Sequence, residues 1–565
     1  MLDLLSKLDT HPAVERLRGV FRRYDERAFY GLFTLMVVLY LLPIALSQFL
    51  PFSDLPGHMG MVGTLVHRGD PSASISKYYV LHPRFAPNSL ELYFTWTVGR
   101  ALNVVIAGRL FAALCVVALP LSVLYALRSF GRNHWLVFLT FPFSYPRILW
   151  FGFMGSTLAV SLMILSVATA HRLTRESHLG YPLGLACLLV LTGMSHPFFF
   201  AATLPLVFLV LAIGSLSQPK RWRSWVGFGA FLPATLVFYS WFKQTFAGLA
   251  ASGPGGSVKE SFVAHLLSKR PDWPVYRKWL SEWSLGAYRS TLETSVLRVL
   301  FWSFAVIGAA GVVYVVWRSV VSGFELRRKL RGFPAEPRRG WWWSDPTGIV
   351  VFVLFGCVLA AYLILPGVIH RPVYWWAVAQ RLVTPLLIFA VLLVPRAVPG
   401  RFAAVFLLPA VVASSWYGAF LTKDFYGHWN RGEMKGLQLA VESIPKGQRV
   451  LALYDDRESH YSHFQLHFGA CYYVAYRGGL AVPFPRAPGY EKIAWAYPKT
   501  LPPSPPWGKL HHFRYRRYGR YYDYFLIKRH ADGKTRWNRF PVRCVSLVGH
   551  YGLWTVVKRL KKPRC

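Results

Sequence analysis

Residues 29–49, FYGLFTLMVVLYLLPIALSQF, contain no charged side chain and lead directly into LPFSDLPGHMG at residues 50–60. An apolar run of about 20 residues is what an α-helix needs to cross the ~30 Å hydrocarbon core of a membrane. The run therefore predicts a membrane-spanning helix. It also places an aspartate and a histidine, Asp54 and His58, just beyond the membrane edge, where a simple reversal of the chain needs neither group.

The composition extends this prediction to most of the chain. Of the 565 residues, 54% are hydrophobic and only 16% are charged, whereas soluble proteins carry about 25% charged residues. Apolar runs recur along the sequence, and we predict an α-helical multi-spanning membrane protein with about 11 transmembrane helices. The predicted spans are 29–49, 107–127, 134–149, 152–171, 179–196, 198–217, 225–247, 295–317, 347–366, 383–400 and 402–421.

The positions of Lys and Arg set the predicted orientation. The formal net charge is +39, but the basic residues stand at the ends of apolar runs, as the positive-inside rule requires. They do not gather on one soluble face, which argues against nucleic-acid binding. We predict a cytoplasmic, basic amino terminus at 1–28 with no cleavable signal peptide. Membrane lipids and a phosphate-bearing substrate are the expected electrostatic partners.

The first external loop, residues 50–106, is predicted to hold two surface helices. One begins near Asp54 and has an apolar stripe at helical spacing. The other lies within 88–106, where Glu91 and Arg100 argue against a span because a central charge costs about 2.5–3.5 kcal/mol. Aspartate is a leading N-cap residue. Helix capping is therefore one explanation of Asp54, and chemistry is the other.

Beyond residue 421 the sequence changes character. The apolar run Val450–Leu453, YYDYFLIKR at 521–529 and GLWTVVKRL at 552–560 are typical of strands. We predict that 422–565 form an extracytoplasmic α/β domain. If this region is outside, Cys471 and Cys544 are candidates for a disulfide.

Two further polar clusters interrupt apolar sequence. SHPFFF at 195–200 places His196 at a break between two spans, and a structural helix break explains it. The segment 365–387 holds His370, Arg371, Tyr374 and Arg381. Arg381 enters an apolar run, so its guanidinium either reaches the lipid headgroups or holds an anion by bidentate hydrogen bonds.

Taken together, these features resemble the GT-C superfamily of membrane glycosyltransferases. The resemblance rests on a first span leading into SDLPGH, a loop with two surface helices, FGFMGSTLAVSLMILSVATAHRL at 151–173, AQRLVTPLLIF at 379–389, and a closing α/β domain. It is nearest to bacterial relatives of the protein O-mannosyltransferases and the lipid A aminoarabinose transferases. It implies transfer of a sugar from a polyprenyl-phosphate carrier to a glycan, lipid or protein acceptor outside the bacterial inner membrane.

The resemblance also implies roles for particular residues. Asp54 matches the acidic residue that acts as catalytic base in that family, but a leucine follows it where many members have a second acid. This difference favours a single-carboxylate base, with no metal or other cofactor. Arg381, and less closely Arg371, match the arginines that hold the lipid phosphate. The expected substrate-binding set is His58, Arg84, His370, Arg371, Tyr374 and Arg381.

Two other function classes stay open. A lipid-linked glycan transporter or flippase would be expected to show internal repeats and a site at the membrane midplane, and the polar groups here cluster at one face. A polysaccharide ligase or polymerase uses external basic groups, and the loop 248–290 supplies His265, Lys269, Arg270, Arg277 and Lys278.

The orientation can be tested with reporter fusions. A periplasmic reporter fused at residue 430 should be active and a cytoplasmic reporter at the same position inactive, because an odd number of spans follows a cytoplasmic amino terminus. Activity of the cytoplasmic reporter would reverse the orientation and, with it, the side on which the site lies.

Overall fold

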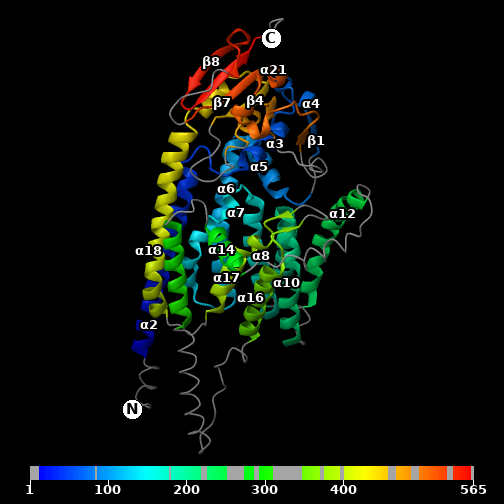
Figure 1. Cartoon of the computed structure of the whole chain (residues 1–565). Helices are drawn as coiled ribbons and strands as arrows, with labels where there is room; N and C mark the ends of the chain where they lie inside the picture. Colours follow the sequence, from blue (N-terminus) through cyan, green and yellow to red (C-terminus); the bar gives the residue numbers. More distant parts are fainter. Residues whose placement is uncertain are drawn as a thin grey trace, which may run out of the picture.

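The computed structural model describes twelve stretches of the chain and the isolated residues 178 and 466. These are 12–82, 86–176, 178, 180–217, 225–250, 273–285, 292–309, 346–369, 375–394, 400–455, 466, 468–484, 496–530 and 539–560. Arg84, His370, Arg371 and Tyr374 lie outside them, as do His265, Lys269 and Arg270. The described chain forms a long helical bundle that carries a smaller unit with a β-sheet at one end (Figure 1).

The bundle is a helical membrane domain. Six described helices are long and apolar enough to cross a membrane: Asp25–Ala45 within α2 (Pro12–Ala45), α6 (Val104–Ser129), α8 (Met154–Arg175), α10 (Pro197–Ser217), the helix Leu292–Ala309, and Thr347–Ile364 within α16 (Pro346–Ile364). Shorter apolar segments are α9 (Gly180–Ser195), Gly227–Tyr239 across η4 (Gly227–Ala230) and α12 (Phe231–Ala250), and Ala379–Leu393 across η6 (Ala379–Leu382) and α17 (Val383–Leu393). Two more helices are α14 (Trp273–Ser284) and α18 (Gly400–Asp424).

The predicted helical span at 134–149 is wrong in its secondary structure. The chain forms the 3₁₀-helices η2 (His134–Leu139) and η3 (Phe141–Ser144) and one α-helical turn, α7 (Arg147–Trp150). Two prolines, Pro142 and Pro146, remove backbone donors that a continuous α-helix would use. The segment is largely buried against other helices, which is where non-α-helical backbone is tolerated at membrane depth.

This irregular segment nevertheless runs the length of the first span. His134 packs on Phe29 at a ring distance of 4.4 Å, and further along the Tyr145 hydroxyl donates to the Tyr40 carbonyl at 2.7 Å. At the far end the Ser53 amide donates to the Trp150 carbonyl at 3.0 Å. The segment therefore runs parallel to α2, from the end near Phe29 to the end where the loop after α2 begins.

Helix α18 also runs parallel to α2, and it leads into the sheet-bearing unit (Figure 1). The Tyr40 hydroxyl donates to the Ser414 carbonyl at 3.0 Å. Beyond the helix ends, the Asn430 side chain pairs with the backbone of Phe49 in both directions, at 3.0 Å each. The loop after α2 and the carboxy-terminal region consequently meet at the same end of the bundle.

The carboxy-terminal unit is built on a five-stranded mixed sheet of order β5-β4-β7-β9-β8. Its strands are β4 (Arg449–Tyr454), β5 (Leu480–Val482), β7 (Tyr524–Lys528), β8 (Val545–Tyr551) and β9 (Trp554–Arg559), and β4 pairs in parallel with β5 and β7. Short helices join them: η7 (Phe425–Glu433, a π-helix), α19 (Leu437–Glu442), α20 (Cys471–Arg477), η9 (Pro506–Gly508), η10 (Leu510–His512), α21 (Tyr515–Tyr518), η11 (Gly519–Tyr521) and η13 (Val542–Cys544).

Cys471 and Cys544, which the sequence offered as candidates for a disulfide, do not pair with each other. Cys471 carries a free thiol that is buried against the loop helix α3, and Cys544 is disulfide-bonded. Spacing alone does not define a disulfide partner.

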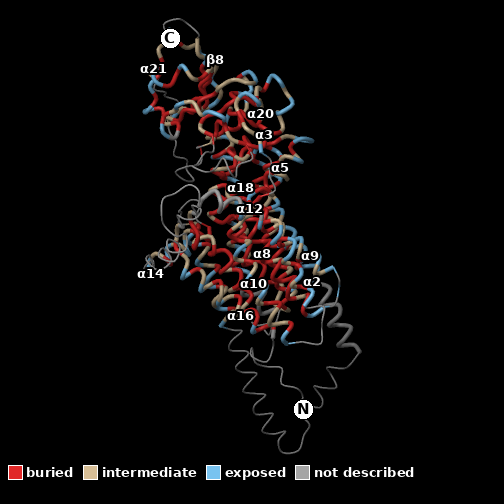
Figure 2. Tube along the Cα trace, turned by 90° about the vertical axis from the view of Figure 1, so that its right-hand side faces the viewer, coloured by how far each residue is buried: buried red, intermediate tan, exposed pale blue. Residues whose placement is uncertain are grey.

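The loop after α2 holds α3 (Leu55–Val66) and α5 (Leu90–Ala101), with η1 (Pro71–Ala73), α4 (Ile75–Tyr78) and strand β1 (Tyr79–Leu81) between them. Strand β1 pairs antiparallel with β6 (Ala496–Pro498) of the carboxy-terminal unit, and α3 packs on α20. Elsewhere β2 (Val368–Ile369) pairs with β3 (Trp375–Trp376). Buried residues run from the bundle into this upper part without a break (Figure 2).

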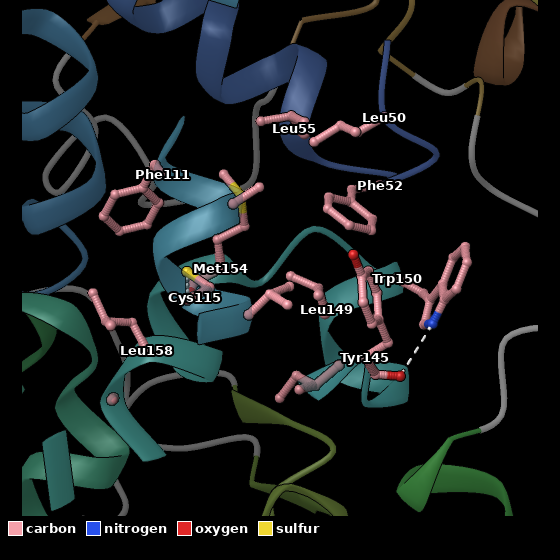
Figure 3. Close-up of a cluster of buried hydrophobic side chains, with 14 of the residues drawn as sticks. Leu50, Phe52, Leu55, Phe111, Cys115, Tyr145, Leu149, Trp150, Met154 and Leu158 are labelled. Carbon is pink, nitrogen blue, oxygen red and sulfur yellow. Dashed lines mark hydrogen bonds between the residues drawn. The ribbon is translucent and has the colours of Figure 1, made fainter. Parts of the chain in front are cut away.

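The start of α3 is fixed by backbone contacts with the turn after α7. The amides of Ser53 and Asp54 donate to the carbonyls of Trp150 and Phe151 at 3.0 and 3.1 Å. Gly152 follows with φ +85°, and a Cβ there would lie 2.5 Å from the Asp54 nitrogen. Phe52 and Leu55, on either side, belong to the buried cluster that includes Trp150 (Figure 3).

We expect Gly152→Ala to lower the Tm of the protein, because a left-handed backbone for a residue other than glycine costs about 1–3 kcal/mol and the methyl group meets backbone atoms. Gly184→Ala in α9 is the matched control, since a Cβ there meets nothing within 4 Å. Thermal unfolding in detergent measures both. Equal Tm values for the two variants would contradict this packing.

Candidate functional site

Asp54 stands at the N-cap position of α3 but does not cap it with its side chain. Its carbonyl accepts the first helical hydrogen bond, from the His58 amide at 3.1 Å. Its carboxylate makes no capping hydrogen bond, and the backbone is helical there, with φ −89° and ψ −12°. Helix capping by the side chain therefore does not explain why an aspartate stands at this position.

His58 lies one helical turn after Asp54 and holds a second acid. Its Nδ1 is 2.6 Å from Oε1 of Glu91, which comes from the first turn of α5. The His58 side chain is 21% exposed and that of Glu91 only 6%. Glu91 is a partner that the sequence analysis missed, although its signal was visible as an acid within an apolar run.

Burial and charge shift the pKa values of both groups on α3. For Asp54, burial disfavours the carboxylate, His58 partly offsets this, and Glu91 adds repulsion, so that the pKa rises to about 6. For His58, burial opposes the charged ring, but the contact with Glu91 and the nearby Asp54 outweigh burial and raise its pKa. Asp54 and His58 therefore hold their protons more tightly than isolated Asp and His side chains do.

Arg381 lies in η6, the 3₁₀ turn that precedes α17, and contacts from several other segments fix its guanidinium. Nε and Nη2 donate to the Trp376 carbonyl at 3.3 and 3.2 Å, and Nη1 donates to Oγ of Ser156 at 2.7 Å. The guanidinium also lies 4.9 Å from the ring centre of Phe153 and 2.7 Å from Nε2 of His196. Within the described stretches, no carboxylate forms an ion pair with Arg381.

The structure brings Asp54 and Arg381 to the same short segment. Asp54 is hydrogen-bonded to the Phe151 backbone, and Arg381 stacks on Phe153 two residues later. Trp376 packs on both phenylalanine rings, at 4.9 and 6.3 Å. Segment 151–153 thus contacts the residue that begins the acidic cluster (Asp54, His58 and Glu91) and also contacts Arg381.

Four of the residues predicted for the site have no described position. Arg84, His370, Arg371 and Tyr374 fall outside the described stretches and stay predictions. His196 and Ser156, which the sequence analysis did not place in the site, contact Arg381. Among the described residues, no group of three or more His, Cys, Asp or Glu is arranged to hold a metal ion.

The fold and these contacts define a multi-spanning helical membrane protein with an α/β domain. No family model matches the sequence, and no curated protein matches it. Among solved structures, the chain is similar to the crystal structure of ArnT from Cupriavidus metallidurans bound to undecaprenyl phosphate. That similarity covers 94% of this chain and 98% of the other, with 12% sequence identity and a TM-score of 0.39.

The raised pKa of Asp54 predicts a pH-dependent stability. The folded protein holds this proton more tightly than the unfolded chain does, so the contribution to stability is full below the ordinary pKa of 3.8 and is lost as pH rises through about 6. Asp54→Asn removes the titration without removing a capping bond. The Tm of the wild type minus that of Asp54→Asn should therefore fall across this pH window and stay constant above it. A difference independent of pH would contradict the shifted pKa.

Proposed function

We propose that the protein is a GT-C-type membrane glycosyltransferase, which moves a sugar from a polyprenyl-phosphate carrier to a hydroxyl of a glycan, lipid or protein acceptor. The observation that carries the proposal is that two groups contact the same segment, 151–153: a carboxylate with a raised pKa and a guanidinium with no described carboxylate partner. One is suited to take a proton and the other to hold an anion.

In the proposed reaction, Asp54 is the general base. Its carboxylate takes the proton of the acceptor hydroxyl while the hydroxyl oxygen attacks the anomeric carbon, on the face opposite the leaving phosphate. The configuration at that carbon is inverted. A base with a pKa of about 6 is mostly ionised at neutral pH and still accepts a proton more readily than an ordinary aspartate.

Arg381 is assigned to the departing lipid phosphate. As the bond between the anomeric carbon and the phosphate oxygen breaks, negative charge grows on the phosphate, and a guanidinium already fixed by Trp376 and Ser156 stabilises it without reorganising. The buried surroundings strengthen that interaction. The bond that is broken already lies in the membrane, so the reaction needs no nucleotide.

We also propose that the end of the bundle with α3 and the carboxy-terminal unit faces outward from the bacterial inner membrane. The disulfide at Cys544 supports this placement, because disulfides persist in oxidising compartments. In this orientation the sheet-bearing unit packs on α3, the helix that begins next to Asp54, and we assign it a role in presenting the acceptor.

The proposal predicts a specific loss of transfer in Asp54→Asn. Removing a general base lowers the rate by about 10²–10⁴-fold, while the amount of folded protein should stay near that of the wild type. Below pH 6 the wild-type rate should fall, because the base becomes protonated. Arg381→Lys keeps the charge but loses the planar fork, and should weaken use of the donor by a smaller factor. Transfer of radiolabelled sugar from a polyprenyl-phosphate donor in purified membranes measures each rate.

Asp70→Asn is the matched control, since Asp70 lies in the same loop and its carboxylate has structural partners in Ser72 and Lys446. Its transfer rate should equal that of the wild type. Normal transfer by Asp54→Asn would refute the assignment of the base, and lipid-linked glycan crossing the membrane without transfer would favour a transporter.

A further inference from the structure

Three helix beginnings meet around Arg381. Ser156 lies in the first turn of α8, His196 immediately precedes α10, and Arg381 lies in the 3₁₀ turn that opens α17. The Ser195 hydroxyl donates to the Gly155 carbonyl at 2.8 Å, which joins the first two helices. The first turns of α8 and α10 contain no acidic residue. The positive ends of these helices thus add to the charge of the guanidinium.

Both ring nitrogens of His196 face hydrogen-bond donors, and a neutral imidazole can accept at only one of them. Nδ1 accepts from the Phe198 amide at 3.2 Å, and Nε2 faces Nη1 of Arg381 at 2.7 Å. A neutral imidazole has one lone pair and one N–H group. If Nδ1 accepts, the N–H group at Nε2 points at a guanidinium donor. If Nε2 accepts from Arg381, the ring proton is on Nδ1, and this N–H group faces the Phe198 amide, which is also a donor.

An oxygen anion resolves this conflict. Placed to one side of this 2.7 Å contact, within hydrogen-bond distance of Nε2 and Nη1, it would accept from both, and Nδ1 would keep the Phe198 amide. Ser156 adds a donor, because its oxygen accepts from Arg381 while its own proton has no acceptor among the described residues. Charge-assisted hydrogen bonds of this kind are about twice as strong as neutral ones. The described part of the site therefore supplies donors and no competing carboxylate.

We propose that Ser156, His196 and Arg381 form one phosphate-binding site, in which one phosphate ester oxygen accepts hydrogen bonds from both His196 Nε2 and the guanidinium. The inference rests on the proposed function for the identity of this phosphate as that of the donor lipid. The new element is His196, which caps α10 through Nδ1 and binds the ligand through Nε2.

The two roles of His196 can be separated by substitution. In His196→Asn, the side-chain oxygen replaces Nδ1 as the cap, and no group reaches the position of Nε2. In His196→Gln, the amide group reaches that position. Losing one hydrogen bond to a charged group costs about 1.5–3 kcal/mol, or about 10- to 100-fold in Kd. His196→Asn should weaken phosphate binding by about this factor, and His196→Gln should recover most of it.

The test measures binding to the full-length protein in detergent, with three probes: farnesyl phosphate, farnesol and inorganic phosphate. Wild type should bind farnesyl phosphate and bind farnesol much less tightly. His550→Asn, which changes a histidine on β8 of the carboxy-terminal sheet, should bind like the wild type. If the Asn protein does not fold, Ser156→Ala tests the same site and should lose about tenfold in Kd, for the same reason.

Several results would overturn the inference. Unchanged farnesyl phosphate affinity in a folded His196→Asn protein would leave His196 as a cap alone. Binding of inorganic phosphate that depends on His196, without binding of farnesyl phosphate, would overturn the assignment to a lipid. Phosphate binding that depends on His196 in a protein that transfers no sugar would support this site and refute the proposed function.

Discussion

The site depends on the backbone hydrogen bonds that join residues 53–54 to residues 150–151. They tie the loop after the first span to the end of the irregular crossing, and Gly152 makes the approach possible because it adopts a left-handed backbone and has no Cβ. The Asp54 carboxylate is thus positioned by main-chain atoms, independently of any cap. The same contact places the acid beside the segment that carries Phe153 and, through it, Arg381.

The irregular crossing at 134–150 makes this contact possible. A 3₁₀-helix rises about 2.0 Å per residue and an α-helix about 1.5 Å, so the tighter helix covers the same thickness with fewer residues. The chain therefore reaches the carboxy-terminal end of α2 early enough to turn at Gly152 and begin α8 at Met154. Burial against α2, α6 and α18 shields its backbone, which a lipid-exposed segment could not tolerate.

The sequence predicted the parts of the fold that have a strong local signal. Hydrophobic runs located the long helices, the stripe after Asp54 located α3, and the run at Val450 located β4. The 3₁₀ crossing was missed because periodicity cannot distinguish a buried apolar helix from another buried backbone of the same length. Cysteine spacing likewise did not reveal which thiol stays free.

Part of the site was predictable for the same reason. Asp54 and Arg381 stood out as charges beside apolar runs, where charge is costly. Glu91, Ser156 and His196 acquire their roles only through tertiary contacts between distant segments, and no local pattern encodes these. The structure describes Asp54, His58 and Arg381, but the other predicted binding residues lie outside the described stretches.

The separation of the two clusters has a physical consequence. If the Asp54 carboxylate met Arg381 directly, the ion pair would lower the pKa of the acid and occupy the guanidinium, which would weaken both the base and the anion site. The nearby cation that lowers the pKa of Asp54 is instead His58, and burial outweighs it. Phe151, which accepts the Asp54 amide, and Phe153, which stacks on Arg381, both pack on Trp376. Because the described stretches show no ion pair between Asp54 and Arg381, burial keeps the pKa of Asp54 raised, and the guanidinium stays available for the anion of the proposed reaction.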